Sequence, residues 1–239
     1  MPTYTRGDAK IHYEVHGEGF PVLALAPGGM RSAIDFWPRM VWDPMARLAG
    51  DFQVVVMDQR NAGQSVAPVS ASDGWADYCA DQLGLMDHLG HERFHVVGMC
   101  IGGSFIMEIA KTAPERMAAA VALQPIGYDG DRQLFLDMFD SWAADVKPDH
   151  PEASDADFDA FNQNLFGSGE FTFNVGEDFA AQCQTPILVM MGNDAHHPQA
   201  TSRRMAELAP NARLIENWKE PEHIEAASAE IEAFLKGHS

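Results

Sequence analysis

Short, continuous runs of apolar residues, each followed by a break and a helical pattern, limit what this chain can fold into. Runs of this kind, without polar alternation, are typical of strands that are buried on both faces of a parallel sheet. The runs are Val22–Ala26, Val54–Met57, His95–Val97, Ala119–Leu123, Ile187–Met191 and Ala212–Ile215. The helical patterns are Trp75–Leu89, Gly103–Ala113, Thr201–Leu208 and Ala226–Lys236. This succession predicts a doubly wound, mostly parallel α/β sheet covered by helices.

The N-terminal segment has a different pattern. Ile11, Tyr13 and Val15 alternate with polar residues, and the glycine-containing stretch Gly17–Gly19 follows them. Alternation that ends in such a stretch predicts a β-hairpin with the next strand.

One interval interrupts the succession of strands and helices. Between Ile126 and Gln182 the sequence shows no buried strand but two helix-like patterns, Arg132–Val146 and Ser154–Phe166. We therefore expect residues 1–125 and 183–239 to form the core and residues 126–182 to form a small helical cap insertion. The apolar face of the insertion consists of Phe135, Met138, Phe139, Trp142, Phe158, Phe161 and Phe166. These side chains either pack the cap onto the core or line an apolar pocket, which would then accept an apolar or aromatic group.

The charge and the cysteines exclude several classes of protein. Lys+Arg number 16 and Asp+Glu number 35, so the formal net charge is -19. Such a surface repels phosphate backbones and anionic membranes, and we expect neither nucleic acid nor membrane as a partner. Three widely spaced cysteines without a CxxC pattern argue against a disulfide framework or a structural zinc site. The polar N-terminus resembles no signal peptide, and the chain is expected to be cytoplasmic with reduced thiols.

The segment with the clearest chemical meaning is Val96-Val97-Gly98-Met99-Cys100-Ile101-Gly102-Gly103-Ser104. A strand ends, glycines stand two positions before and two positions after Cys100, and a helix begins. A nucleophile on so sharp a turn has a strained backbone, and side chains at the flanking positions would collide. The spacing is not that of a dinucleotide-binding loop, and no G-K-[ST] of a P-loop is present. A buried structural cysteine beside a glycine-rich turn remains an alternative at this point.

Together with three further segments, this motif resembles the α/β-hydrolase fold family. Leu25–Met30 is similar to the oxyanion loop after the family's third strand, with Pro27 in place of a histidine. Asp58–Ser65 is similar to a structural D-x-R-G-x-G-x-S segment. Gly192-Asn193-Asp194 follows a buried strand, and His223 lies beyond the last strand. The order of nucleophile, acid and histidine is that of the family. Most members have serine at the elbow, whereas dienelactone hydrolases have cysteine.

The resemblance implies roles for five residues. Cys100 would be the nucleophile, His223 the base and Asp194 the carboxylate that orients it. The backbone N–H groups of Ile101 and Gly29 would form the oxyanion hole, with Met30 as the alternative second donor.

Competing assignments come from neighbouring residues. His196 and His197 follow Asp194 closely and compete with His223, and Asp129 is a weaker alternative acid. A metal ion is not expected, because the two histidines have no third ligand at a suitable spacing. No cofactor is expected either.

The predicted function is hydrolysis of small-molecule carboxylic esters, lactones or thioesters through a thioester acyl-enzyme. Two alternatives stay open. Interception of the acyl-enzyme by an alcohol or a thiol would make the protein an acyltransferase. A non-catalytic small-molecule binding protein on the same fold is the other.

Overall fold

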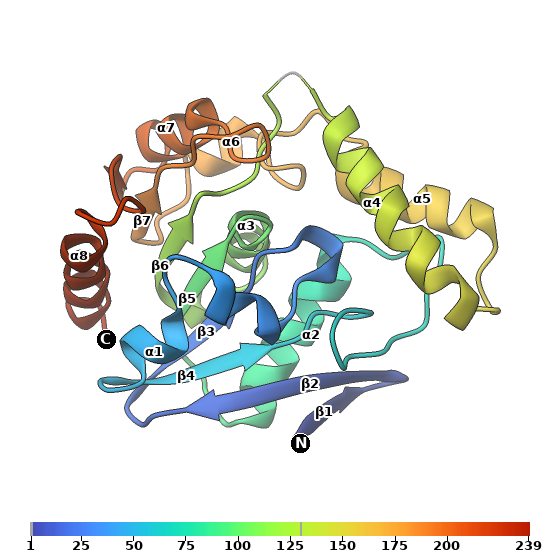
Figure 1. The fold of residues 1–239 in the computed structure, drawn as a ribbon, viewed down its shortest axis with the longest axis horizontal. Helices are drawn as coiled ribbons and strands as arrows, with labels where there is room; N and C mark the ends of the chain where they lie inside the picture. The colour runs from blue at the N-terminus through green and yellow to red at the C-terminus, as the bar shows by residue number, and fades with distance from the viewer. Residues whose placement is uncertain (1, 130) are drawn as a thin grey trace.

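An eight-stranded sheet forms the centre of the computed structural model, which describes residues 2–129 and 131–239 (Figure 1). The strands are β1 (Thr3–Arg6), β2 (Ala9–His16), β3 (Phe20–Leu25), β4 (Phe52–Met57), β5 (Phe94–Met99), β6 (Met117–Leu123), β7 (Ile187–Met190) and β8 (Ala212–Ile215). Their order across the sheet is β1-β2-β4-β3-β5-β6-β7-β8. The pairs from β4 to β8 are parallel, and β2 is antiparallel to both β1 and β4. The predicted mostly parallel sheet is confirmed.

The predicted hairpin between the N-terminal strand and the next one is wrong. β2 pairs with β4, with Tyr13 opposite Met57 and Val15 opposite Val55, and β3 lies on the far side of β4. The reason is burial. β3 is a continuous apolar strand that pairs in parallel with β4 and β5 on its two sides, whereas β2 alternates and leaves Val15 40% exposed. An alternating strand suits the outer part of the sheet.

Helices cover both faces of the sheet. They are α1 (Pro44–Leu48), α2 (Trp75–His88), α3 (Gly102–Thr112), α4 (Gln133–Val146), α5 (Asp155–Phe166), α6 (Glu177–Ala180), α7 (Gln199–Leu208) and α8 (Ile224–Lys236), with 3-10 turns η1 (Gly29–Arg31), η2 (Ile34–Arg39), η3 (Pro114–Arg116) and η4 (Lys147–Asp149). The connection from β3 to β4 runs one way across the sheet and that from β4 to β5 runs the other way. Right-handed crossovers therefore put α1 and α2 on opposite faces. α3 packs beside α2, and an Arg47–Glu225 ion pair of 2.9 Å joins α1 to α8.

α4, α5 and α6 lie in the chain between β6 and β7, and in Figure 1 α4 and α5 form a pair at the opposite end of the molecule from α8. The two helices predicted between Ile126 and Gln182 are confirmed within a residue at each end. Their aromatic side chains are buried at 2% exposure or less: Phe135, Phe139, Trp142, Phe158, Phe161 and Phe166. They contact one another and the rings of Trp75 and Tyr78 on α2, so packing is what these rings do. Within the described residues, no helix combines the length and apolarity that a membrane crossing requires.

The parallel strands point the same way, so the loops that follow β3, β5, β6, β7 and β8 meet at one edge of the sheet. In open α/β sheets this carboxyl edge is where ligands bind. Every catalytic residue that the sequence suggests follows one of these strands.

Candidate active site

Cys100 lies on a sharp turn between β5 and α3, with a φ of 61° that is rare for a residue other than glycine. Its N–H donates to the carbonyl of Leu123 at 3.0 Å, and its own carbonyl accepts from the N–H of Ile126 at 3.1 Å. The turn is tight because a Cβ atom at Gly98 would lie only 2.5 Å from the carbonyl oxygen of Gly102. The strained turn that the motif predicts is therefore present, and Cys100 on it is 9% exposed.

A second turn, after β7, joins Asp194 to His197. The Asp194 carboxylate accepts the backbone N–H groups of His196 and His197 at 3.0 and 3.1 Å. The Nδ1 atom of His197 lies 2.8 Å from Oδ2 of the same carboxylate. Gly192 allows the turn to fold back, because a Cβ atom there would lie 2.6 Å from the Cβ of His197. The Nδ1–H donor to Asp194 leaves Nε2 as the free nitrogen of the neutral ring.

The protonation equilibria of this pair are linked to Cys100. Burial alone would lower the pKa of His197, but hydrogen bonding and charge attraction from Cys100, and then from Asp194, raise it above its ordinary value. Burial alone would raise the pKa of Asp194, but the interactions with His197 hold it below its ordinary value. Both shifts favour an imidazolium at His197 paired with an ionised Asp194 carboxylate.

Cys100 influences the pKa of His197 without forming an aligned hydrogen bond to its ring. The Nε2 atom is buried and, within the described residues, has no partner of ordinary hydrogen-bond geometry. Cys100 is nevertheless the polar group that acts most strongly on the His197 ring. Catalytic hydrogen bonds are often long or misaligned before substrate is bound. The arrangement therefore leaves Nε2 available to accept the thiol proton.

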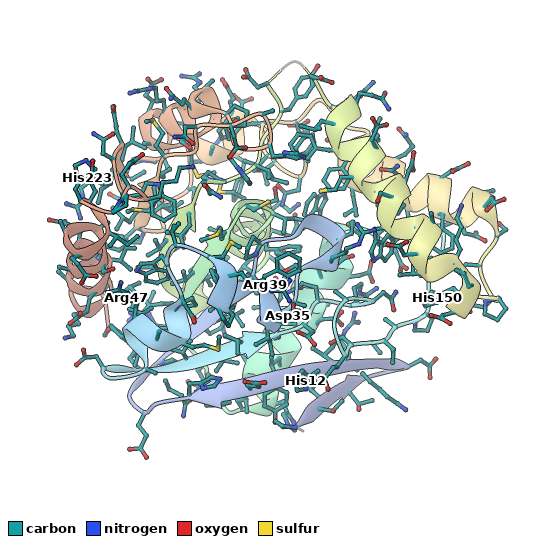
Figure 2. All side chains as sticks on the ribbon, in the orientation of Figure 1. His12, Asp35, Arg39, Arg47, His150 and His223 are labelled. Atoms are coloured by element: carbon teal, nitrogen blue, oxygen red, sulfur yellow. The ribbon has the colours of Figure 1, made fainter. Side chains whose placement is uncertain are left out.

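The structure brings His197, rather than His223, to Cys100. Figure 2 shows His223 at the margin of the molecule, where it precedes the first turn of α8. Its side chain makes no hydrogen bond or ion pair with any described residue. The reason is the short connection after β8: the indole of Trp218 is fixed to the carbonyl of Met191 at 2.8 Å, and the N–H of His223 already donates to Glu220. The histidine that binds Asp194 is therefore His197 and not His223, a pairing that the spacing Asp-x-x-His after Gly192 could have indicated.

The other two competing residues take different places. The ring of His196 packs edge-on against Phe135 of α4, with 6.1 Å between ring centres, and faces the cap instead of the thiol. Asp129 lines a cleft of about 530 Å³ beside the acid, together with Asp131 and Asp194. Neither the His196 nor the Asp129 side chain forms a hydrogen bond with His197 among the described residues. Asp194 is therefore the carboxylate that binds the His197 ring.

Backbone donors for an oxyanion stand near the elbow. The N–H groups of Ile101, Gly29 and Met30 donate no hydrogen bond within residues 2–129 and 131–239. Ile101 follows the nucleophile, and Gly29 begins η1 after β3, the strand next to β5. An oxyanion hole requires backbone N–H groups that donate no other hydrogen bond, and loops that follow adjacent strands can supply them. Both Gly29 and Met30 remain as the second donor.

The remaining thiols and acidic clusters show no further chemistry. Cys79 and Cys183 are buried free thiols, and burial raises the pKa of Cys79. In the part of the chain that the structure describes, no group of three or more His, Cys, Asp or Glu side chains is placed to hold a metal ion.

Known proteins resemble the chain over most of its length. The family profile described as alpha/beta hydrolase fold matches residues 21–167, more than half of the chain. RutD of Azorhizobium caulinodans, whose proposed activity is that of a carbamate hydrolase, is 36% identical over 91% of this chain and 90% of RutD. The 2-hydroxymuconate semialdehyde hydrolase of Pseudomonas putida is 24% identical over 92% of this chain and 88% of that enzyme. The crystal structure of the enol-lactonase from Burkholderia xenovorans LB400 has a TM-score of 0.73 and 21% identity, and the match covers 98% of this chain and all of that one.

Proposed function

Because the chain belongs to the α/β-hydrolase fold family, we propose that it hydrolyses small carboxylic esters, lactones or thioesters with Cys100 as nucleophile. His197 is the base in this proposal, and Asp194 fixes the tautomer and orientation of its ring. The N–H groups of Ile101 and Gly29 stabilise the oxyanion.

One observation carries the proposal: a single imidazole, that of His197, is linked both to a carboxylate and to Cys100. The Asp194 carboxylate binds Nδ1 of the ring at 2.8 Å, and Cys100 raises the pKa of the same ring. A structural cysteine would need neither a φ of 61° nor a neighbouring histidine with a raised pKa. This arrangement favours catalysis over the alternative of a merely buried thiol.

The chemistry then follows in two steps. In the first, Nε2 of His197 takes the thiol proton, sulfur forms a bond to the carbonyl carbon, and the carbonyl π electrons move onto oxygen. When the carbonyl re-forms, the bond to the leaving group breaks, His197 donates its proton to that group, and a thioester remains on Cys100. In the second step, His197 takes a proton from water, the resulting hydroxide adds to the thioester, and the acid leaves as the thiol is restored.

The substrates named for the relatives guide the choice of substrate class. They are a carbamate for RutD and a lactone for the enol-lactonase, and both contain a carbonyl bonded to a heteroatom. A thiolate leaves a tetrahedral intermediate more readily than an alkoxide does. The cysteine therefore favours activated carbonyls such as aryl esters, lactones and thioesters over plain amides.

Incubation with 4-nitrophenyl acetate, followed by intact-protein mass spectrometry and turnover measurements, tests the proposal. We expect an acyl adduct on the wild-type protein and none on Cys100→Ala. His197→Ala should lower kcat/KM by about 10²- to 10⁴-fold, the usual contribution of a general base. His223→Ala is the matched control and should keep nearly all activity, because Cys100 and Asp194 act on the ring of His197 and the His223 side chain has no hydrogen-bond or ion-pair partner among the described residues.

The opposite pattern, with full activity in His197→Ala and its loss in His223→Ala, would overturn the assignment of the base. Absence of turnover and adduct on a panel of aryl esters, lactones and thioesters would favour the non-catalytic alternative. Product analysis with added alcohol or thiol acceptors distinguishes hydrolysis from acyl transfer.

A further inference from the structure

The thioether of Met138 lies directly against the loop that carries Gly29. A Cβ atom on Gly29 would collide with Sδ of Met138 and would lie 2.9 Å from its Cε atom. On Gly28, a Cβ atom would lie 2.9 Å from the Cζ atom of Phe36. Side chains from two different elements, α4 and η2, therefore enclose the loop that holds the second oxyanion donor.

Met138 is held in this place by the rest of α4. Arg31, the last residue of η1, donates through Nη2 to the carbonyl of Ser141 at 2.9 Å and pairs with the carboxylate of Asp145 at 2.5 Å. The indole of Trp142 donates to the carbonyl of Asn61 at 3.1 Å. Positions 138, 141, 142 and 145 recur every three or four residues and so share one face of the helix. That face docks onto the core, and it carries Met138 to the oxyanion loop.

This placement has a direct consequence for an acyl group. The oxygen of a bound carbonyl would lie about 3 Å from the N–H donors of Gly29 and Ile101. Because the Met138 thioether contacts Gly29, an acyl group held at that donor would lie close to the Met138 side chain.

The buried aromatic side chains of the cap do not offer a substitute pocket. Phe139 and Phe161 are not exposed at all, and their rings are 5.1 Å apart, edge to face. Phe135 is 1% exposed and packs on Phe173. The expectation that an aromatic cap lining receives an aromatic acyl group therefore does not apply to these rings.

We propose that Met138 determines the acyl specificity of the site and restricts it to short acyl groups, from acetyl to about butyryl. The proposal rests on the function proposed above, because it takes Cys100 as the nucleophile. A methionine side chain is flexible, so the restriction is one of size with some tolerance and not a rigid wall. Shortening residue 138 should open space for longer acyl chains.

The test compares 4-nitrophenyl acetate, butyrate and octanoate with wild-type protein, Met138→Ala and Met138→Phe. In Met138→Ala the ratio of kcat/KM for octanoate to that for acetate should rise by about ten-fold or more, since a methylene in an apolar pocket changes selectivity by this order. Met138→Phe should lower activity on butyrate more than on acetate. Met45→Ala is the matched control, because Met45 is also half-buried but lies on α1, and it should leave the ratio unchanged.

An unchanged ratio in a Met138→Ala protein that is folded and hydrolyses acetate would overturn the proposal. If instead the wild type hydrolyses none of the esters, the hydrolase function fails, and a second measurement decides the inference. Peptide mapping gives the rates at which iodoacetamide and the bulkier N-benzylmaleimide alkylate Cys100. Met138→Ala should raise the relative rate of the bulky reagent by about ten-fold, and equal relative rates in wild type and variant would contradict the size restriction.

Discussion

Asp194 combines two tasks within four residues of chain. Its carboxylate closes the turn by accepting two backbone N–H groups, and it also binds the ring of His197. The same side chain therefore shapes the backbone that carries His197 and orients the His197 ring. Removing the carboxylate should affect both.

Asp194→Asn should lower the pKa of His197, because one of the two groups that raise it loses its negative charge. Measurement of the His197 ring resonances by NMR titration checks this, with His223 as an internal reference that should not move. The sign for stability follows. A histidine with a raised pKa stabilises the fold below its unfolded value of about 6.5, and this contribution is lost as pH rises through the folded pKa. In Asp194→Asn that loss should occur at lower pH, and an unchanged His197 titration would contradict the assigned contacts.

The strained turn at Cys100 could be predicted at residue scale, and the histidine that binds Asp194 could not. Glycines are needed around Cys100 because side chains there would clash with neighbouring residues, and a requirement between neighbouring residues can be seen in the sequence. The choice between His197 and His223 depends on how the chain runs between β8 and α8, where a short connection places His223 directly before the helix. The order of the residues along the chain does not indicate this placement.

At the scale of elements, α4 is fixed to the oxyanion loop by exposed polar contacts. The Arg31 and Asp145 side chains are 38% and 68% exposed, so their ion pair adds little to global stability. The pair instead joins two elements that are separated by more than 100 residues of sequence. We expect the Arg31–Asp145 ion pair to make local unfolding of α4 less frequent.

Arg31→Ala should accelerate hydrogen exchange of the α4 backbone amides while it changes the free energy of unfolding by less than about 1 kcal/mol. Hydrogen exchange followed by mass spectrometry measures both α4 and, as a reference, α8. Arg47→Ala is the matched control, because Arg47 forms a comparable surface pair with Glu225 between α1 and α8 (Figure 2). Equal α4 exchange in wild type and Arg31→Ala would show that other contacts hold the cap.

The sequence predicted elements better than it predicted their pairing. The bounds of α4 and α5 could be predicted because apolar periodicity is a property of the helix's own residues. The pairing of β2 could not be predicted in this way, because its partner β4 lies almost forty residues later in the chain. The docking of Met138 on Gly29 is a contact of the same long-range kind.

At the scale of the whole molecule, the net charge of -19 acts on the substrate before any contact is made. The cleft beside Asp194 carries two further carboxylates, those of Asp129 and Asp131. A neutral acyl substrate approaches without penalty, whereas an anionic one is repelled.

The kcat/KM for 4-nitrophenyl succinate, which carries a carboxylate, should therefore rise about two- to ten-fold with added salt, because the Debye length falls from about 30 Å at 0.01 M to about 8 Å at 0.15 M. The neutral butyrate ester, similar in length, should show no such rise. Stopped-flow or steady-state rates across this range of ionic strength measure the difference. Equal salt dependence of the two esters would mean that the surface charge does not influence binding.

Asp194 and His197 share a single turn and therefore move as one unit. Their mutual geometry survives any shift of that turn, and only their distance from Cys100 remains to be set by the strands β5, β6 and β7. In the proposed mechanism the polypeptide beyond Ile215 supplies no catalytic residue, so changes in its length should leave the Asp194–His197 pair intact.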